Sequence, residues 1–200
     1  MNKPVAAAAE QNKAPIANAL QTILRSGDLV LELGSGTGQH ACHFAREFPD
    51  ISWQPTELGA LLPVIDLWIR DEGSDNILRP IELDASLQYW PVESADVVYT
   101  ANTLHIVSAA TIERMFLGAG SVLHAEGRFC AYGPFMLNGE HTADSNAEFD
   151  RALKQNDPAS GVRDMVWLDS LAVANGMQAA ELVPMPANNF LAVWRRAALH

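Results

Sequence analysis

The chain has 200 residues, of which 48% are hydrophobic and 18% are charged, and its formal net charge is −11. This length and composition predict one globular domain with a substantial core, and the negative charge argues against long nucleic acid as a partner. Residues 1–13 lack the apolar core of a signal peptide, and no run of roughly 18 apolar residues is long enough to span a membrane. Cys42 and Cys130 are far apart, which favours buried thiols over a disulfide or zinc framework. We therefore expect a cytoplasmic protein.

The first half of the chain alternates predicted helices and strands. Pro15 is a favourable residue for a first helical turn, and the apolar face that follows it predicts a helix ending at Gly27. The short apolar run 28–34 predicts a strand. Further elements follow in order: a helix to Pro49, a strand at 51–57, a helix at 61–69, a weaker strand at 76–84 and a strand at 95–102.

The second half begins with a helical face at 112–123 and a strand at 126–135. The pattern then lapses from 136 to 162, where Ser145 and Glu148 have the spacing of a capping box and predict the start of a short helix. A stretch of this length between regular elements is more often functional than idle. A helix from about Asp164 to Ala174 is followed by two strands, 177–184 and 188–196, with no helix between them.

This order of elements predicts an α/β fold. Strands that alternate with helices form a mainly parallel sheet covered on both faces, and the final pair without a helix predicts antiparallel pairing at one edge. We expect a single domain over 1–200, with an amino-terminal lid and helix at 1–27 and an inserted cap at 135–163.

The turn after the first strand carries glycines at alternate positions, in the sequence LVLELGSGTGQH. Glycines let backbone amides approach a ligand, and ligands bind such sheets beyond the carboxyl ends of the strands. A dinucleotide site would require G-x-G-x-x-G, but position 39 is Gln39. The spacing here is E-x-G-x-G-x-G, counted from Glu32.

That spacing resembles motif I of the class I methyltransferases, which bind S-adenosylmethionine (SAM). The resemblance implies a Rossmann-like, seven-stranded sheet and a glycine turn under the methionine part of the cofactor. It also implies that Glu57, 19 residues beyond Gly38 at the end of the second strand, binds the ribose, and that Asp84 lies near the adenine. A carboxylate suits two vicinal hydroxyls because it accepts two charge-assisted hydrogen bonds. The expected cofactor residues are Glu32, Gly34, Ser35, Gly36, Thr37, Gly38, Glu57, Asp84 and Asn102.

The resemblance to one family extends over nearly the whole chain. The strings AEQNKAPI, ELGSGTGQHACHFA, WQPTE, ANTLHI, YGPF, SNAEFDRALKQNDPASGVRD and MPANNFLAVWRR occur in this order. They resemble the bacterial domain-of-unknown-function 938 family, which is similar to methyltransferase-like protein 26 of animals. This resemblance implies a SAM-dependent methyltransferase with S-adenosylhomocysteine (SAH) as its product, and it implies no particular acceptor.

Candidate acceptor residues follow the fourth and fifth strands. His105 has an ordinary pKa near neutrality and is a candidate general base; its other interpretation is a histidine bonded to a loop carbonyl. Asn102 is a candidate to orient substrate or contact the cofactor, or it caps a loop. Tyr132 ends the fifth strand on the ligand side. The stretch ANTLHI has no Pro-Pro and no aromatic residue where the N/D-P-P-Y/W motif of adenine-N6 methyltransferases would require them.

Four further residues are predicted to face the substrate: Asn12, His40, Asn146 and Arg163. Asn12 belongs to a lid, or it starts the first helix. Arg163 suits a carboxylate or phosphate, so it predicts an anionic acceptor if it reaches the site; surface ion pairing is the alternative. His40 and His43 have helical spacing, but no third and fourth ligands are evident, so we expect no metal site.

The sequence thus predicts methyl transfer from SAM to a small, unidentified acceptor. Its main rival is a protein that binds SAM or SAH without catalysis, as a sensor or scaffold. A closed pocket lined by His105 and Arg163 would favour the enzyme, and an exposed apolar surface with no acceptor cavity beside the methyl group would favour the scaffold. The oligomeric state does not follow from the sequence.

Overall fold

The computed structural model describes residues 3–198; residues 1–2 and 199–200 of the expected domain lie outside the described part. Its main sheet has seven strands in the order β3-β2-β1-β4-β5-β10-β9. These strands are β1 (Leu29–Glu32), β2 (Ser52–Glu57), β3 (Ile81–Glu82), β4 (Ala95–Ala101), β5 (Leu123–Gly133), β9 (Glu181–Met185) and β10 (Asn189–Arg195). The α/β, Rossmann-like fold with a mostly parallel sheet is therefore confirmed.

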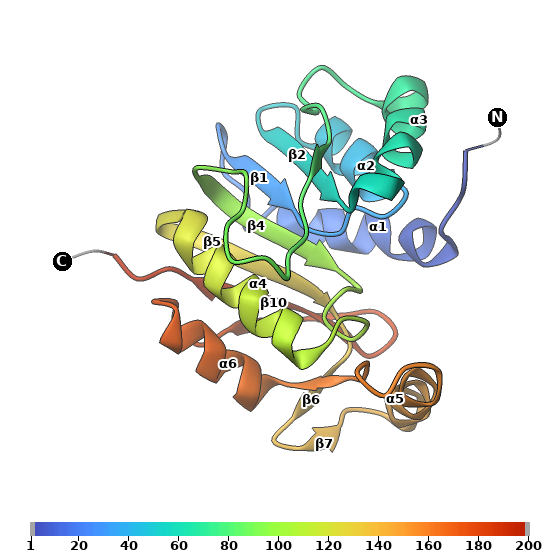
Figure 1. The fold of residues 1–200 in the computed structure, drawn as a ribbon, viewed down its shortest axis with the longest axis vertical. Helices are drawn as coiled ribbons and strands as arrows, with labels where there is room; N and C mark the ends of the chain where they lie inside the picture. The colour runs from blue at the N-terminus through green and yellow to red at the C-terminus, as the bar shows by residue number, and fades with distance from the viewer. Residues whose placement is uncertain (1–2, 199–200) are drawn as a thin grey trace.

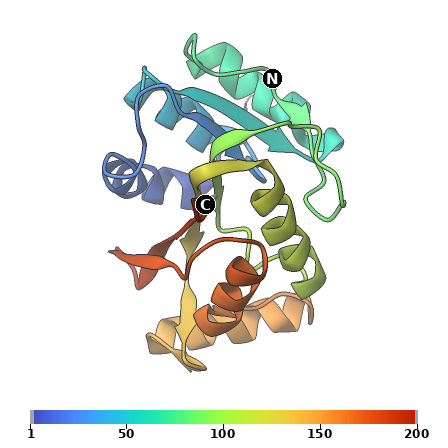
Figure 2. The same cartoon turned by 90° about the vertical axis from the view of Figure 1, so that its left-hand side faces the viewer.

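Helices cover both faces of the sheet, because side chains of β1, β4, β5, β9 and β10 alternate between two apolar clusters. One face carries α4 (Ala109–Val122) and α6 (Met165–Ala174). The other carries α1 (Ala7–Leu20) and α2 (Gln39–Glu47), with α3 (Leu62–Glu72) beside α2. Figure 1 shows the strands between these helices, and the side view in Figure 2 places the blue helix α1 and the yellow-green helix α4 on opposite sides of them.

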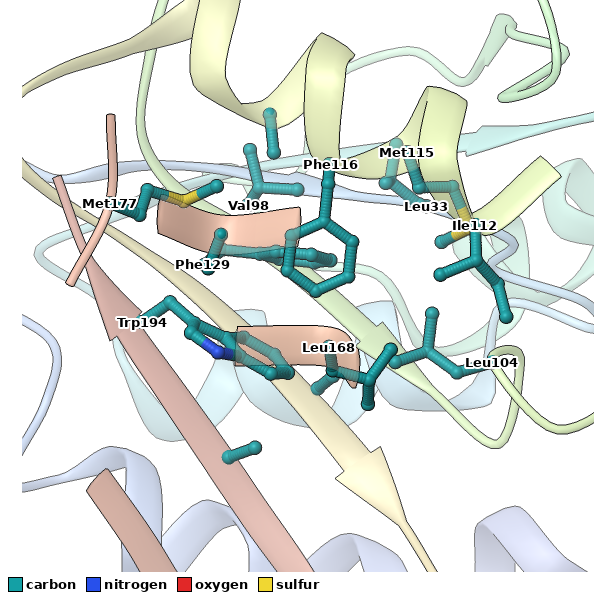
Figure 3. Packing of buried hydrophobic residues seen from close by; sticks show 14 of the residues in the cluster. Leu33, Val98, Leu104, Ile112, Met115, Phe116, Phe129, Leu168, Met177 and Trp194 are labelled. Atoms are coloured by element: carbon teal, nitrogen blue, oxygen red, sulfur yellow. The ribbon is translucent and has the colours of Figure 1, made fainter. Parts of the chain in front are cut away.

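The cluster under α4 and α6 is organised around three aromatic rings. Phe116 of α4 packs edge-on against Phe129 and Trp194, with ring centroids 5.1 and 5.0 Å apart. All three side chains are fully buried, and Figure 3 shows them stacked between the helix and the sheet. Each such ring removes a large apolar area from water, so this cluster fixes the helices against the strands that carry the site.

The expected antiparallel pairing lies at the predicted edge of the sheet. β10 runs antiparallel to both β5 and β9, so the edge strand β9 has the same direction as the rest of the sheet. A turn joins β9 and β10 without a helix, and Ala187 and Asn188 in it adopt positive φ values of 57° and 56°.

The first helix begins earlier than predicted. α1 starts at Ala7, and Pro15 lies inside it rather than in its first turn. The proline leaves the carbonyl of Gln11 without a helical partner, but Gln11 is exposed, so water can satisfy that carbonyl. Consequently Glu10, Asn12 and Lys13 belong to the helix, and the interpretation that Asn12 starts it is wrong.

The segment between β5 and α6 is ordered. It contains β6 (Phe135–Leu137), β7 (Glu140–His141), α5 (Asp144–Asn156) and β8 (Arg163–Asp164), and the strands form a small second sheet in the order β7-β6-β8. The predicted capping box is wrong, because the N-cap of α5 is Ala143 and no side chain caps it. Within residues 3–198, no helix is both long enough and apolar enough to cross a membrane.

Candidate functional site

A cleft of about 500 Å³ lies beyond the carboxyl ends of the central strands. We call it the glycine cleft. It is lined by the amino-terminal end of α1, by the turn after β1, by Glu57 and by the residues that follow β4. Its lining residues are Ala6, Ala8, Ala9, Gly34, Ser35, Gly36, Thr37, Gln39, His40, Glu57, Leu61, Ala101, Asn102, Thr103 and Ile106. Four expected cofactor residues of the turn (34–37), together with Glu57 and Asn102, are thus brought together.

The three positions of the turn require glycine for different structural reasons. All have positive φ, at 68° for Gly34, 56° for Gly36 and 88° for Gly38. A Cβ on Gly34 would lie 3.2 Å from Thr103 Oγ1, and one on Gly38 would lie 3.0 Å from Ile65 Cγ2, so these two glycines permit close packing. A Cβ on Gly36 would meet nothing within 4 Å. At Gly36, therefore, the absent side chain leaves space for a ligand to approach the backbone.

Glu57 closes the cleft on the β2 side. Its Oε2 accepts a hydrogen bond of 2.8 Å from the backbone N–H of Gly36, and its Oε1 accepts one of 2.9 Å from Leu58. The carboxylate is thereby fixed beside the open position of the turn. Asp84 is placed differently: it binds the backbone N–H and the hydroxyl of Ser86, and it is not among the residues that line the cleft.

Glu32 lies beneath the turn rather than in its lining. It is buried, and its Oε2 accepts hydrogen bonds from Ser35 Oγ at 2.8 Å and from Trp53 Nε1 at 3.0 Å. Burial raises the pKa of Glu32 to about 7, against the opposing effect of these two donors. The structure thus gives Glu32, and the Ser35 hydroxyl bound to it, a role in supporting the turn.

The raised pKa of Glu32 predicts a pH-dependent stability difference. The folded pKa lies above the unfolded one, so this group contributes stability at acidic pH that is lost as the pH rises through about 7. In Glu32→Gln this loss is absent, and Gln still accepts from Trp53 and Ser35. We expect the free energy of unfolding of Glu32→Gln, relative to the parent protein, to increase by on the order of 2 kcal/mol between pH 5 and pH 8. Urea unfolding at both pH values measures it, and a constant difference would contradict the assignment.

Gln39 is a site residue that the sequence analysis missed. Its Oε1 accepts hydrogen bonds from the backbone N–H of Ala6 at 2.5 Å and from the Thr37 hydroxyl at 2.8 Å. Its Nε2 donates a hydrogen bond to Glu10 Oε1 at 2.5 Å. Gln39 therefore ties the amino-terminal end of α1 to the glycine turn. The available signal was a polar residue directly after the glycines. Two partners of Gln39, Glu10 and Ala6, lie 29 and 33 residues away in the sequence.

His40 and Asn12 form a second tie between α1 and α2. His40 Nε2 lies 2.7 Å from Asn12 Oδ1, and its ring stacks on Phe44 with centroids 5.1 Å apart. Burial, and then the charge of His43, lower the pKa of His40 to about 4, so the ring is neutral near pH 7. His40 lines the glycine cleft, whereas Asn12 and Tyr132 line a smaller cavity of about 170 Å³ that shares Asn102 with the cleft. Burial raises the pKa of the Tyr132 hydroxyl there.

A third cavity, of about 330 Å³, adjoins α5, and we call it the α5 chamber. Its lining residues are Asn102, His105, Pro134, Ser145, Asn146, Phe149, Ala187 and Asn189. Asn102, at the end of β4 with φ 58°, is part of both the glycine cleft and the chamber. In Figure 1 the arrowheads of β4 and β5 point toward the side on which α5 lies. The structure thus joins the two cavities at Asn102.

His105 is the titratable group of the chamber. It is buried, and its ring packs edge-on against Phe149 with centroids 5.1 Å apart. Burial, and then the charge of Arg163, lower its pKa to about 4. The imidazole is therefore neutral near pH 7 and has a free lone pair. No hydrogen bond holds the ring among residues 3–198, unlike that of His40.

Arg163 does not reach either cavity, which corrects its predicted contact with substrate. Its Nε donates to the carbonyl of Leu104 at 3.1 Å, and one terminal nitrogen donates to the carbonyls of Val107 and Ala159, both at 2.6 Å. With these donors occupied, the guanidinium fastens the segment before α6 to the loop after β4. Asn146, by contrast, lines the chamber, and its Nδ2 donates to Thr142 Oγ1 and to the carbonyl of Asn188, both at 3.0 Å.

The solved structures that this fold resembles include methyltransferases. The SAH-bound form of CalO1, a methyltransferase in calicheamicin biosynthesis, is 19% identical over 95% of this chain and 54% of its own, with a TM-score of 0.80. Human N-acetylserotonin methyltransferase in complex with SAM is 14% identical over 96% of this chain and 53% of its own, with a TM-score of 0.79. The mitomycin 7-O-methyltransferase MmcR is 15% identical over 95% of this chain and 54% of its own, with a TM-score of 0.81. These identities show a shared fold, and the chain spans about half the length of the structures it matches.

A family model also matches almost the whole chain. The model is described as "Protein of unknown function (DUF938)", and it matches residues 3–196. The match therefore includes α1, the glycine turn, the α5 chamber and the β9–β10 pair, and it confirms the family indicated by the sequence strings.

Proposed function

The chain belongs to the DUF938 family, and we propose that it is a SAM-dependent methyltransferase acting on a small molecule. The observation that carries this proposal is the junction of two cavities at Asn102. One cavity has the features of a nucleoside and amino-acid site, and the other provides separate space for an acceptor. Fold likeness supports the cofactor, whereas the acceptor must be argued from the site itself.

The glycine cleft fits SAM or SAH in two respects. The open position at Gly36 lets a ligand approach the backbone closely, and the fixed carboxylate of Glu57 beside it can accept hydrogen bonds from two ribose hydroxyls. The volume of about 500 Å³ lies in the range of cofactor sites, roughly 300–1,000 Å³.

Bound SAM would supply an electrophilic methyl group. The protein then has to align the acceptor, exclude water and take up one proton. In our proposal Asn102 orients the acceptor at the junction, and the neutral His105 accepts the proton that a hydroxyl or amine loses. Tyr132 lines neither the glycine cleft nor the α5 chamber, so we assign it no chemical step. The α5 chamber also favours an enzyme over a SAH-binding scaffold, which would not need it.

Calorimetric titration with SAH tests the cofactor site. We expect SAH to bind and NAD not to bind. Glu57→Gln should weaken SAH about 30-fold, because one charged acceptor of the ribose hydroxyls is lost and a charge-assisted bond contributes about 2 kcal/mol. The matched control is Glu82→Gln. Glu82 is the register partner of Glu57 in the neighbouring strand β3, but it does not line the cleft. Absence of SAH binding, or equal losses in the two variants, would refute the proposal.

A further inference from the structure

The α5 chamber contains no side chain that is charged near pH 7. Of its eight lining residues three are asparagines, and none is Lys, Arg, Asp or Glu. The sole titratable member, His105, is neutral because of its lowered pKa. Arg163, the cation predicted for this place, does not line the chamber, and its Nε and one terminal nitrogen donate to three carbonyls. Among residues 3–198, therefore, no charged side chain that could pair with an ionised acceptor lines the chamber.

The polar groups that remain free have a definite hydrogen-bonding character. Asn146 uses both hydrogens of its amide nitrogen on Thr142 and Asn188, so Oδ1, an acceptor, remains for a ligand. The neutral ring of His105 also presents an acceptor nitrogen. The side chain of Asn102 makes no hydrogen bond within the described part of the chain, and it can both donate and accept. The chamber therefore complements a molecule with O–H or N–H donors.

The rest of the wall is apolar and partly aromatic. Phe149 remains 40% exposed although it packs against His105, and Pro134 and Ala187 complete the apolar part. An exposed ring of this kind offers a surface for a flat ligand, since offset and edge-on contacts between rings are favourable. The volume of about 330 Å³ suits a molecule of one or two rings.

From these three features we propose that the acceptor of this enzyme is an uncharged, planar molecule of one or two rings that carries a hydroxyl or amino donor. This inference rests on the proposed function, because it names the substrate class of the same site. It replaces the anionic acceptor expected from Arg163. Asn146 and His105 receive its donors, Phe149 contacts its ring, and Asn102 holds it next to the cofactor.

Two probes of equal shape and different charge test the proposal. The Kd values of 4-hydroxybenzamide, which is neutral, and 4-hydroxybenzoate, which is anionic at pH 7.5, are measured by ligand-observed NMR on the full chain with and without saturating SAH. We expect the amide to bind at least tenfold more tightly than the carboxylate, a difference of about 1.4 kcal/mol. Phe149→Ala, at an exposed position, should weaken the amide at least fivefold.

A charge introduced at the wall provides the control. Ser145 lines the chamber and is exposed, so Ser145→Lys should fold and should bring the Kd of 4-hydroxybenzoate to or below that of the amide. Ser170→Lys adds the same charge on α6, outside the chamber, and should leave the preference unchanged. Equal or tighter binding of 4-hydroxybenzoate by the parent protein, or binding of neither probe, overturns the inference. The SAH titration is read separately, so a failure of the proposed cofactor site is distinguished from a failure of the proposed acceptor.

Discussion

Replacing Gly36 with valine is expected to abolish measurable SAH binding, a loss of at least about 300-fold, or roughly 3.4 kcal/mol. Gly36 is the glycine of the turn whose absent side chain faces open space, and it lines the glycine cleft. A branched side chain there would occupy the space that a ligand needs to reach the backbone. Its φ of 56° also disfavours any residue with a Cβ, which would disturb the N–H that holds Glu57.

The matched control for this substitution is Gly139→Val. Gly139 lies between β6 and β7 with a φ of 82°, a Cβ there would also meet nothing within 4 Å, and it does not line the cleft. Both variants should therefore carry a similar backbone cost, of about 1–2 kcal/mol. Thermal unfolding compares their stabilities, and calorimetry compares their SAH affinities. Retention of SAH binding by Gly36→Val within tenfold of the parent, or an equal loss in Gly139→Val, would contradict the role of Gly36.

The features whose place in the structure follows from the sequence depend on local geometry and on strand order. The glycine turn was recognisable because positive φ restricts the residue type at each position. Glu57 followed from the rule that the carboxyl ends of parallel strands meet at one edge of a sheet, and β2 indeed lies beside β1. Asn102 and His105 were found in the same way, from the end of β4.

The features predicted wrongly or not at all depend on partners distant in sequence. Arg163 is a plausible anion ligand by residue type, but the carbonyls of Leu104 and Val107, more than 50 residues away, occupy it. Gln39 could be read only as a missing glycine until Ala6 was seen to lie against it. Pro15 suggested a helix start by its local preference, whereas packing of α1 on α2 extends the helix through it.

The largest expected loss of stability comes from Arg128, in the middle of β5 and outside the lining of the glycine cleft. Its side chain is 2% exposed, and one terminal nitrogen donates to both carboxylate oxygens of Asp28, at 3.0 and 2.9 Å, while the other donates to the carbonyl of Ile23. Arg128→Met removes the charge that compensates the buried Asp28. The free energy of unfolding should fall by about 3–5 kcal/mol, measured by urea denaturation at pH 7.

The neighbouring Arg195 separates the cost of a buried charge from the general cost of losing an arginine. It is the register partner of Arg128 across the β5–β10 pair, but its side chain is 42% exposed and lies 3.7 Å from Glu181, which is 69% exposed. Arg195→Met should therefore lower the free energy of unfolding by less than about 1 kcal/mol.

Adding Asp28→Asn to Arg128→Met should restore at least half of the stability lost in Arg128→Met, because the uncompensated charge is then gone. Equal losses in the two arginine variants would show that packing of the side chain, not the charge of Asp28, accounts for the effect. Since neither arginine lines the glycine cleft, both folded variants should bind SAH like the parent protein.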